Sequence, residues 1–312
     1  MTPDPLLPEL TARARRMAHS RTPTCPCGAT RTLLHRPDAT VVRHADTVAK
    51  AHPPGTDPAD LALRLTAAAQ HPDVFLRPLS PTPVALHGRL VTFWPYGTPV
   101  DPDDPDAAPW ESAATLLARL HRTPVRGPLP TMRGPAKAAR ALARLRAIGD
   151  TPPAAVPVLR AWATLPAWAR AEAPMPDTST ALCHGDLHLG QLVRLPDGPW
   201  RLIDVDDLGV GVPAWDLARP AAWFACGLLP AEEWARFLDA YRAAGGPAVP
   251  ADADPWAVLD VPARALTVQT AARMITKAVV ERRLLDEVEQ SVVDACERMV
   301  TLPPRERHEF GK

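Results

Sequence analysis

The stretch HGDLHLGQ at residues 184–191, together with the run WRLIDV at residues 200–205, decides how this sequence folds. The second run follows the turn signal Pro-Asp-Gly and is short and apolar, so we expect a β-hairpin between the two segments. Such a hairpin returns Asp204 to the side of Gln191. A carboxylate beside an amide oxygen suits the hard cation Mg²⁺. The pattern therefore predicts a magnesium site.

A third oxygen-bearing side chain, Asp186, lies in the same stretch. Phosphoryl transfer from ATP requires a carboxylate near the acceptor hydroxyl in addition to oxygen ligands for Mg²⁺. His184 and Asp186 are followed after four residues by Gln191, which matches the His-x-Asp-x₄-Asn spacing of the protein-kinase catalytic loop. The sequence therefore predicts a phosphotransfer centre formed by Asp186, Gln191 and Asp204.

Three strings carry a family resemblance: WESAATLLARLH at residues 110–121, HGDLHLGQLV at 184–193 and LIDVDDLGVGVPAWDLARP at 202–220. They resemble the aminoglycoside phosphotransferase and choline kinase family of small-molecule kinases. The resemblance covers most of the chain and is sharpest between about residues 181 and 220. It implies the two-lobed fold of protein kinases, ATP and Mg²⁺ as cofactors, and a small-molecule hydroxyl as acceptor.

By this resemblance Asp186 is the catalytic carboxylate, and Gln191 and Asp204 are the metal ligands. Most family members carry Asn at the position of Gln191, and this chain contains no Asn. The longer side chain moves the amide oxygen outward, which the loop has to absorb to keep octahedral Mg²⁺ geometry. The string HGDLHLGQ also occurs in maltokinase-like members, so we expect Gln191 to be a tolerated variant.

Other polar residues of this segment have structural as well as functional explanations. His184 is expected to brace the loop, and His188 to be satisfied by backbone groups. Asp206 and Asp207 are candidates for supporting the site or for forming a turn. Asp216 lies on the family's Asp-Leu-Ala signature and is expected to be structural, because it stands near the start of an apolar run.

Short β-favouring runs precede this centre at residues 32–35, 40–43 and 47–51, separated by polar turn residues. They predict a small antiparallel sheet. We expect an amphipathic helix over residues 3–18 before it, followed by a Pro-interrupted loop over residues 22–27.

Lys50 lies in the third of these runs and is one of four lysines in a chain that otherwise uses Arg. Lysine acts as a compact charge on phosphate oxygens, and the family places an ATP-binding Lys on this strand. An exposed strand residue is the alternative. Kinases pair this Lys with a Glu of the next helix, but the expected helix after Asp57 contains no Glu. Asp57 is expected to cap that helix, whereas Asp60 is either part of its start or the partner of Lys50.

The strand-like run at residues 89–97 ends in Pro and Gly before an acidic linker, and we expect it to be the hinge between two lobes. In kinase-like folds the adenine lies against this hinge, so Phe93 and Trp94 are candidates for its site, with core packing as an equal alternative. This division predicts a nucleotide-binding lobe and hinge over residues 1–97 and a catalytic and acceptor-binding lobe over residues 98–312.

Helical spacing of apolar residues dominates the second lobe. The expected helices span residues 110–121, 136–148, 156–171, 213–226, 231–244 and 256–300. In the family such helices build the acceptor pocket, whose rim candidates are Asp207, Glu232, Glu233 and Asp239. The expected fold class is therefore α+β, with a small antiparallel-sheet lobe and a larger, mainly helical lobe.

Length, charge and cysteine content narrow the class of protein further. With 312 residues and 46% hydrophobic content the chain can bury a large core in two lobes. Its formal net charge is zero, so the chain lacks the basic excess expected of a protein that binds nucleic acid or an acidic membrane. It also lacks the acidic excess expected of a protein that binds polycationic drugs. Cys25 and Cys27 form a lone C-x-C, and the five cysteines show neither paired zinc spacing nor a disulfide framework. Without a signal-like or membrane-spanning run, the protein is expected to be cytoplasmic.

The sequence thus predicts an ATP- and Mg²⁺-dependent kinase for a small-molecule hydroxyl. An antibiotic and a sugar, the latter as in maltokinase-like members, are the open acceptor classes. A catalytically silent nucleotide-binding or scaffolding protein on the same fold is the alternative. The missing helix Glu and Gln191 support it, and so does the poorly marked phosphate loop, since Gly28 is the only glycine before Gly55. The retention of Asp186, Asp204 and Lys50 opposes it, because a scaffold needs none of them.

Overall fold

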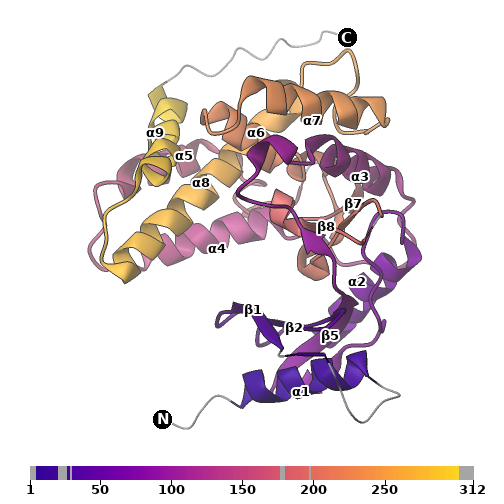
Figure 1. Ribbon diagram of the computed structural model, residues 1–312. Coiled ribbons are helices and arrows are strands. Elements are labelled where there is room, and N and C mark those ends of the chain that lie inside the picture. Colours follow the sequence, from indigo (N-terminus) through magenta and orange to yellow (C-terminus); the bar gives the residue numbers. More distant parts are fainter. Residues whose placement is uncertain (1–4, 20–26, 29, 176–179, 197, 302–312) are drawn as a thin grey trace.

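The computed structural model of the chain describes residues 5–19, 27–28, 30–175, 180–196 and 198–301. A smaller part holds an antiparallel sheet, and a larger part is mainly helical (Figure 1). The expected α+β fold with two unequal lobes is therefore confirmed.

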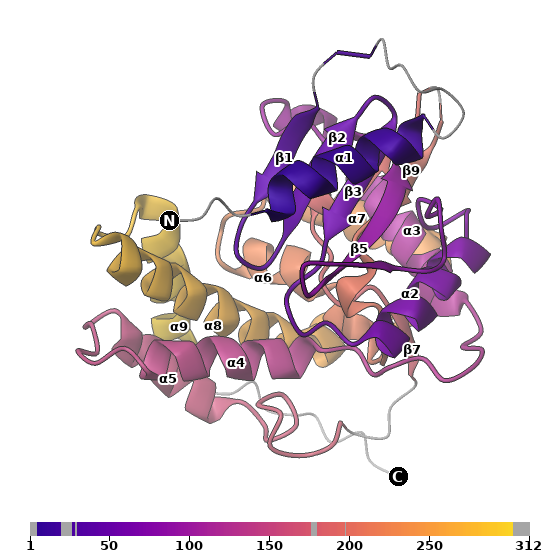
Figure 2. The ribbon, with the colours of Figure 1, turned by 90° about the horizontal axis from the view of Figure 1, so that it is seen from below.

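The smaller part is a five-stranded antiparallel sheet in the order β1-β2-β3-β5-β4, covered on one face by a helix. The strands are β1 (Arg31–His35), β2 (Thr40–His44), β3 (Thr47–Ala51), β4 (Val84–Leu86) and β5 (Arg89–Pro95), and the helix is α1 (Leu6–Ala18). Figure 2 shows α1 lying across the sheet. The three strands predicted first are confirmed to within one residue at each end, whereas most of the loop predicted after α1 lies outside the described residues.

β3 sends its side chains alternately to the two faces of the sheet. Ala49 and Ala51 pack with Leu10 of α1 and with Phe93 of β5. Lys50 stands between the two alanines and points to the opposite face, because successive strand residues face opposite sides. That face is turned toward the larger part of the molecule, which Lys50 contacts.

α2 (Pro58–Gln70) follows the first three strands. Asp57 caps it by accepting a hydrogen bond from the backbone N–H of Asp60 at 2.9 Å, as expected. Leu61 and Leu65 of α2 nevertheless belong to the main hydrophobic cluster of the larger part. Because this cluster draws residues from both sides of the predicted lobe boundary, the boundary stays a prediction.

The larger part contains α3 (Trp110–Arg122), α4 (Gly134–Arg146), α5 (Ala155–Thr164), α6 (Ala218–Ala225), α7 (Ala231–Ala243), α8 (Trp256–Glu281) and α9 (Glu287–Thr301). α4, α5, α8 and α9 pack together around one cluster, while α3 packs against α7 (Figures 1 and 2). Among the described helices, none is both long and apolar enough to cross a membrane.

Three of the expected helices differ from the structure. α5 stops at Thr164 because Pro166 disfavours helical geometry at the residue before it. The single helix expected over residues 256–300 is interrupted at Arg282, which adopts a left-handed φ of 53°. The expected helix over residues 213–226 starts as a separate 3₁₀ turn, and α6 begins only after Asp216 has turned toward the catalytic loop.

Two small sheets frame the segment that decides the fold. They comprise the antiparallel pair β7 (Ala181–Cys183) and β10 (Gly209–Gly211) and the three strands β6 (Thr98–Pro99), β8 (Leu192–Arg194) and β9 (Trp200–Leu202). Short 3₁₀ turns lie nearby, namely η1 (Pro105–Ala107), η2 (Leu189–Gln191), η3 (Val205–Asp207) and η4 (Pro213–Trp215). β8 and β9 are the expected hairpin, which continues to the hydrogen bond from the Ile203 N–H to the Gln191 carbonyl at 2.9 Å.

Candidate active site

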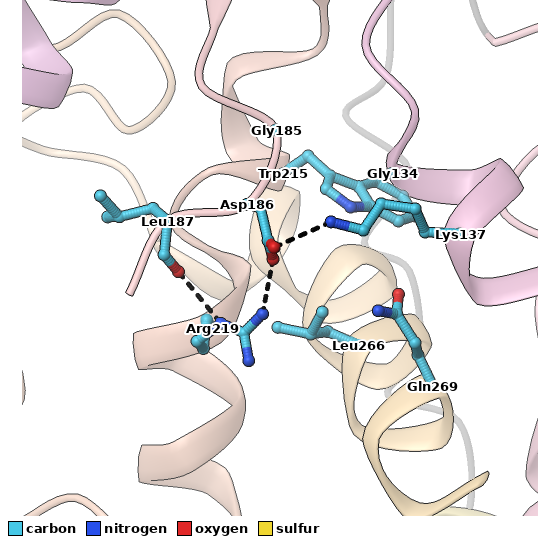
Figure 3. A pocket seen from close by; sticks show the side chains of 9 residues that line it. All are labelled: Gly134, Lys137, Gly185, Asp186, Leu187, Trp215, Arg219, Leu266 and Gln269. Atoms are coloured by element: carbon cyan, nitrogen blue, oxygen red, sulfur yellow. Dashed lines mark hydrogen bonds and ion pairs between the residues drawn. The ribbon is translucent and has the colours of Figure 1, made fainter. Parts of the chain in front are cut away.

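The loop between β7 and β8 carries Asp186, and Gly185 fixes its path. Gly185 adopts a φ of +81°, and a Cβ atom there would lie 2.4 Å from the carbonyl oxygen of Asp207. Only glycine combines this backbone conformation with so close an approach. The Asp186 side chain then projects into a pocket bordered by α4, α6 and α8 (Figure 3).

Asp216 anchors this loop from the protein interior. Its two carboxylate oxygens accept the backbone N–H groups of His184 and Gly185 at 2.6 and 2.7 Å, and His121 Nε2 lies 3.1 Å from it. Burial alone would raise the pKa of Asp216, but the hydrogen bond from His121 and the neighbouring His184 and Gly185 groups lower it. Asp216 therefore stays charged and holds the catalytic loop, rather than capping a helix with its side chain.

The two histidines of the loop serve its geometry. His184 Nε2 lies 2.8 Å from the carbonyl of Ile203, which ties the loop to the end of β9. His188 Nδ1 accepts the Gly190 N–H at 3.1 Å, and its Nε2 lies 3.1 Å from the Gln191 amide nitrogen. Burial, together with a neighbouring guanidinium, lowers the pKa of His188 to about 4, so this ring is neutral at pH 7. These positions correspond to the bracing role expected for His184 and to the backbone contact expected for His188.

The hairpin places the predicted metal ligands next to each other. The Gln191 amide nitrogen lies 3.5 Å from Asp204 Oδ2. Asp204 adopts a φ of 63°, a left-handed conformation that Asp tolerates better than most residues. Turning the Gln191 amide about its terminal bond presents oxygen instead of nitrogen at the same place, so both side chains can supply oxygen ligands.

Lys50 reaches this pair from the sheet. Its Nζ lies 2.7 Å from Asp204 Oδ1 and 3.0 Å from Asp206 Oδ2. Burial would lower the pKa of Lys50, but the two carboxylates outweigh it and hold the pKa above its usual value. Asp60 instead lies 3.6 Å from Arg64 on its own helix. The acidic partner missing from α2 is therefore supplied by Asp206.

A chain of polar groups behind Lys50 fixes Asp206. His52 Nδ1 lies 2.7 Å from Asp206 Oδ1, and His52 Nε2 lies 2.8 Å from Thr92 Oγ1, which also accepts the indole N–H of Trp94 at 2.9 Å. Because Thr92 accepts from the Trp94 indole, it donates to His52 Nε2, which leaves Nδ1 as the nitrogen that carries a proton toward Asp206. Burial would raise the pKa of Asp206, but Lys50 and His52 hold it well below its usual range.

The Asp186 carboxylate is held between two cationic side chains. Lys137 Nζ lies 3.0 Å from one of its oxygens and the Arg219 guanidinium 2.8 Å from the other (Figure 3). Lys137 also pairs with Asp207 at 2.7 Å, and so does Arg133 at 2.7 Å. Burial would raise the pKa of Asp186, but Lys137 and Arg219 outweigh it and hold the pKa well below its usual range. Three cationic side chains therefore face two carboxylates on this side of the loop.

The pocket beside Asp186 combines apolar walls with one free amide. Trp215 and Leu266 line it, and Gln269 of α8 extends its amide into the same space (Figure 3). Gln269 is 3% exposed. Within the part of the chain that the structure describes, no hydrogen-bond partner is found for this amide, although a buried amide usually has one. The pocket therefore offers an unused donor and acceptor next to Asp186.

Several of these residues are not among the sequence predictions. Lys137 carried a usable signal, because the scarcity of lysine that draws attention to Lys50 applies equally to it. Arg219 stands inside the family string at residues 202–220. Gln269 and His52 carry no comparable signal, since a single polar residue in an apolar helix or strand does not reveal which cavity it borders.

The structure separates the two residues predicted for the adenine site. Phe93 packs in the cluster beneath α1, on the sheet face away from Lys50, so its predicted place at the nucleotide is wrong. Neighbouring strand residues cannot share a face, and Trp94 consequently lies on the Lys50 side. There it is 7% exposed and packs with the core of the larger part. Trp94 thus remains the candidate of the pair.

The predicted acceptor residues of α7 lie outside the pocket. Glu232 is exposed, and Glu233 pairs with Arg236, which also binds Glu111 of α3. α7 packs on α3 at the edge of the molecule opposite the sheet (Figure 1), and neither residue lines the pocket at Asp186, so their role at the acceptor stays a prediction. Asp207 does border the site, but as the carboxylate that Lys137 and Arg133 neutralise.

Replacing Lys137 with Met should move the acid limb of the pH–rate profile upward by about one pH unit or more, because an opposite charge within a few ångströms lowers a carboxyl pKa by that amount or more. Removal of the ammonium lets Asp186 take up its proton at higher pH. The measurement is kcat/KM for the acceptor between acidic and neutral pH. Lys277→Met, which removes a largely exposed lysine of α8, should leave the limb in place. A limb that does not move in Lys137→Met would show that Lys137 leaves the acidity of Asp186 unchanged.

Solved structures of similar fold come from several kinds of phosphotransferase. A choline/ethanolamine kinase family protein from Mesorhizobium loti is 16% identical, with a TM-score of 0.60 and coverage of 94% of this chain and 96% of that one. A thermostable mutant of aminoglycoside phosphotransferase APH(4)-Ia is 12% identical, with a TM-score of 0.62 and coverage of 91% and 97%. Macrolide 2′-phosphotransferase MphH from Brachybacterium faecium is 19% identical, with a TM-score of 0.53 and coverage of 95% and 99%. At these identities the similarities show the fold alone.

No curated protein matches the chain in sequence. The family model described as the phosphotransferase enzyme family, APH, matches residues 30–257, which is more than half of the chain and includes Lys50, the whole catalytic loop and Asp204. The match agrees with the strings that carried the resemblance and with the fold of the solved structures. The chain therefore belongs to the phosphotransferase enzyme family.

Proposed function

We propose that the protein transfers the γ-phosphoryl group of ATP to a hydroxyl group of a small molecule. The observation that carries the proposal is the contact between Lys50 and Asp204, which joins the sheet to the catalytic hairpin across 154 residues of sequence at 2.7 Å. A phosphate-binding lysine and a metal-binding carboxylate have to meet in this way at the phosphates of a nucleotide. Membership of the phosphotransferase family supports the same assignment.

The residues at the hairpin fit Mg²⁺. Gln191 and Asp204 would hold the ion, since both offer oxygen and Mg²⁺ keeps several waters besides its protein ligands. Bound there, Mg²⁺ would neutralise charge on the phosphates. Lys50 would place its ammonium on the phosphate oxygens, and Asp206, fixed by His52, would keep that ammonium in position.

Asp186 would orient the acceptor hydroxyl and receive its proton. A carboxylate of low pKa is a weak base, so proton transfer to Asp186 belongs late in the reaction, when the hydroxyl oxygen has begun to bond to phosphorus. Orientation is then its earlier contribution, because a fixed hydroxyl avoids the entropic cost of a chance encounter. Lys137 and Arg219 support this role by keeping the carboxylate charged and in place.

We infer that the acceptor is neutral or anionic near its reacting hydroxyl. Lys137 and Arg219 flank Asp186, and Arg133 adds a third positive charge close by. A polycationic acceptor would meet repulsion there, which favours a sugar or another hydroxyl-rich molecule over an aminoglycoside. The free amide of Gln269 suits such an acceptor, since a hydroxyl can both donate to it and accept from it.

Mass spectrometry of reactions with Mg-ATP and pooled acceptors tests the proposal. The pools contain sugars, sugar acids, amino alcohols, aminoglycosides and neutral antibiotics, and a metal-dependent thermal shift measures nucleotide binding in parallel. We expect one neutral or anionic acceptor to gain a phosphate. Phosphorylation of an aminoglycoside alone would refute the inference about acceptor charge, while failure to bind Mg-ATP would support the silent scaffold.

Replacing Gln269 with Ala should raise KM for the acceptor by about fivefold or more, because a hydrogen bond in a buried pocket is worth about 1 kcal/mol or more. KM for ATP should not change, since Gln269 lines the pocket at Asp186, to which Lys50 and Asp204 do not contribute. Steady-state kinetics with each substrate varied in turn measure both constants. Gln290→Ala on α9 is the matched control, because that glutamine is exposed. Equal changes in the two KM values would argue against a contact between Gln269 and the acceptor.

A further inference from the structure

We propose that His19, Cys27 and His44 form a binding site for Zn²⁺ or a similar transition-metal ion, separate from the phosphotransfer site. His19 directly follows α1, Cys27 lies in the connection to the sheet, and His44 ends β2. The three residues thus gather where α1 meets the sheet, on the face turned away from Lys50. The inference does not depend on the proposed function.

The distances suit a metal of small radius. Cys27 Sγ lies 3.3 Å from His19 Nε2, and one potential ligand atom of each residue lies within 4.8 Å of the other two. Zinc lies about 2.0 Å from nitrogen and about 2.3 Å from sulfur, so its tetrahedral ligands lie roughly 3.3 to 3.8 Å from one another. The rings of His19 and His44 are nearly perpendicular, at 84° with centroids 5.3 Å apart, so they approach one point without stacking. Small side-chain rotations therefore close the site.

His44 has the support that a ligating histidine usually has. Its Nδ1 lies 2.9 Å from the hydroxyl oxygen of Thr30, and a metal-bound imidazole commonly donates its second ring N–H to an oxygen in this way. His44 is also buried, so the surrounding residues hold its ring in place. The fixed and supported orientation of His44 favours coordination.

The chemistry of the three ligands points to a borderline or soft cation rather than to Mg²⁺. Imidazole nitrogen and thiolate sulfur select zinc and related transition metals, whereas Mg²⁺ prefers oxygen. Binding would convert the Cys27 thiol to a thiolate, with its proton released to solvent as the metal–sulfur bond forms.

A second group of potential ligands lies in the larger part of the molecule. His121, Cys183 and Asp216 also lie within 4.8 Å of one another. There His121 is already engaged by Tyr241 and Asp216, and Asp216 by the catalytic loop. That group is a hydrogen-bond network that anchors the catalytic loop, and we assign it no metal.

Titration of the full chain with Co²⁺ in excess Mg²⁺ tests the site. Co²⁺ bound to a thiolate gives a charge-transfer band in the near ultraviolet, which oxygen ligands at the phosphotransfer site do not give. We expect the band to saturate at one equivalent, to disappear on addition of Zn²⁺ and to be absent in Cys27→Ser. Thr30→Val, which keeps all three ligands, should weaken Co²⁺ binding by about 10- to 100-fold, the usual effect of losing a supporting hydrogen bond.

Controls separate this site from unspecific binding. His87→Gln removes a histidine of the same part of the molecule that pairs with Glu9 outside the cluster, and it should leave the titration unchanged. Absence of the band in the unmodified chain would overturn the proposal. So would a band that survives Cys27→Ser but is lost in Cys25→Ser, a residue outside the described part of the chain. These outcomes are independent of kinase activity, because none requires ATP or an acceptor.

Discussion

Replacing Asp186 with Asn is expected to lower kcat/KM for the acceptor by about 10²- to 10⁴-fold, the contribution of a positioned acid–base group. Asn keeps the shape of the side chain but can neither hold the hydroxyl through a charged oxygen nor take up its proton. Binding of Mg-ATP should persist, because Lys50, Gln191 and Asp204 do not contact Asp186 directly. The measurements are kcat/KM with the acceptor and the thermal shift with Mg-ATP.

Asp103→Asn, in the exposed stretch before α3, is the matched control and should have full activity. A variant Asp186→Asn that turns over normally would remove Asp186 from the mechanism. Loss of nucleotide binding together with turnover would instead show that the substitution had disturbed the loop, since Lys137 and Arg219 both pair with this carboxylate. The two results are distinguishable because turnover and nucleotide binding are measured separately.

Replacing Asp216 with Asn is expected to reduce the free energy of unfolding by about 3 kcal/mol, because breaking a buried pair leaves an unmatched polar group inside the protein. The carboxylate accepts two backbone N–H groups and faces His121. An Asn side chain has one oxygen, so its NH₂ group would oppose either a backbone N–H or the imidazole. The catalytic loop should therefore lose both stability and its fixed path.

Chemical denaturation measures the first effect, and kcat under conditions where the variant is folded measures the second. Asp239→Asn is a suitable control, because Asp239 is exposed on α7 and the substitution should change stability by less than about 0.5 kcal/mol. Stability of Asp216→Asn equal to that of the unmodified chain would contradict the anchoring role. Such a result would mean that the loop is held mainly by Gly185 and by the contact of His184 with Ile203.

Local sequence signals predicted the parts of the site that depend on neighbours in the chain. The hairpin over β8 and β9 follows from two short apolar runs around a turn, and it brings Gln191 to Asp204 because the register of a hairpin is set within a few residues. The cap at Asp57 is likewise local. Lys50 could be predicted because lysine is scarce in this chain, which otherwise uses Arg.

Alternation along a strand limited what the sequence could say about Phe93 and Trp94. Two neighbouring residues of β5 must face opposite sides, so at most one of them lies on the Lys50 face of the sheet. Which one does depends on where α1 packs, and the helix covers the face that holds Phe93. The sequence contains no local feature that selects this face, because both positions are aromatic and apolar.

The sequence by itself determined the family chemistry, that is, the carboxylates, the amide and the lysine that phosphoryl transfer requires, and the order of strands and helices that carries them. Only the tertiary structure decided which groups surround them. Lys137, Arg219 and Gln269 reach one pocket from three helices, and Asp206 replaces a helix Glu as the partner of Lys50. Hairpins, caps and strand periodicity arise from interactions within a few residues, so the local sequence predicts them. Charge pairs between distant elements arise from the packing of whole helices and strands, and no single segment of the sequence specifies that packing.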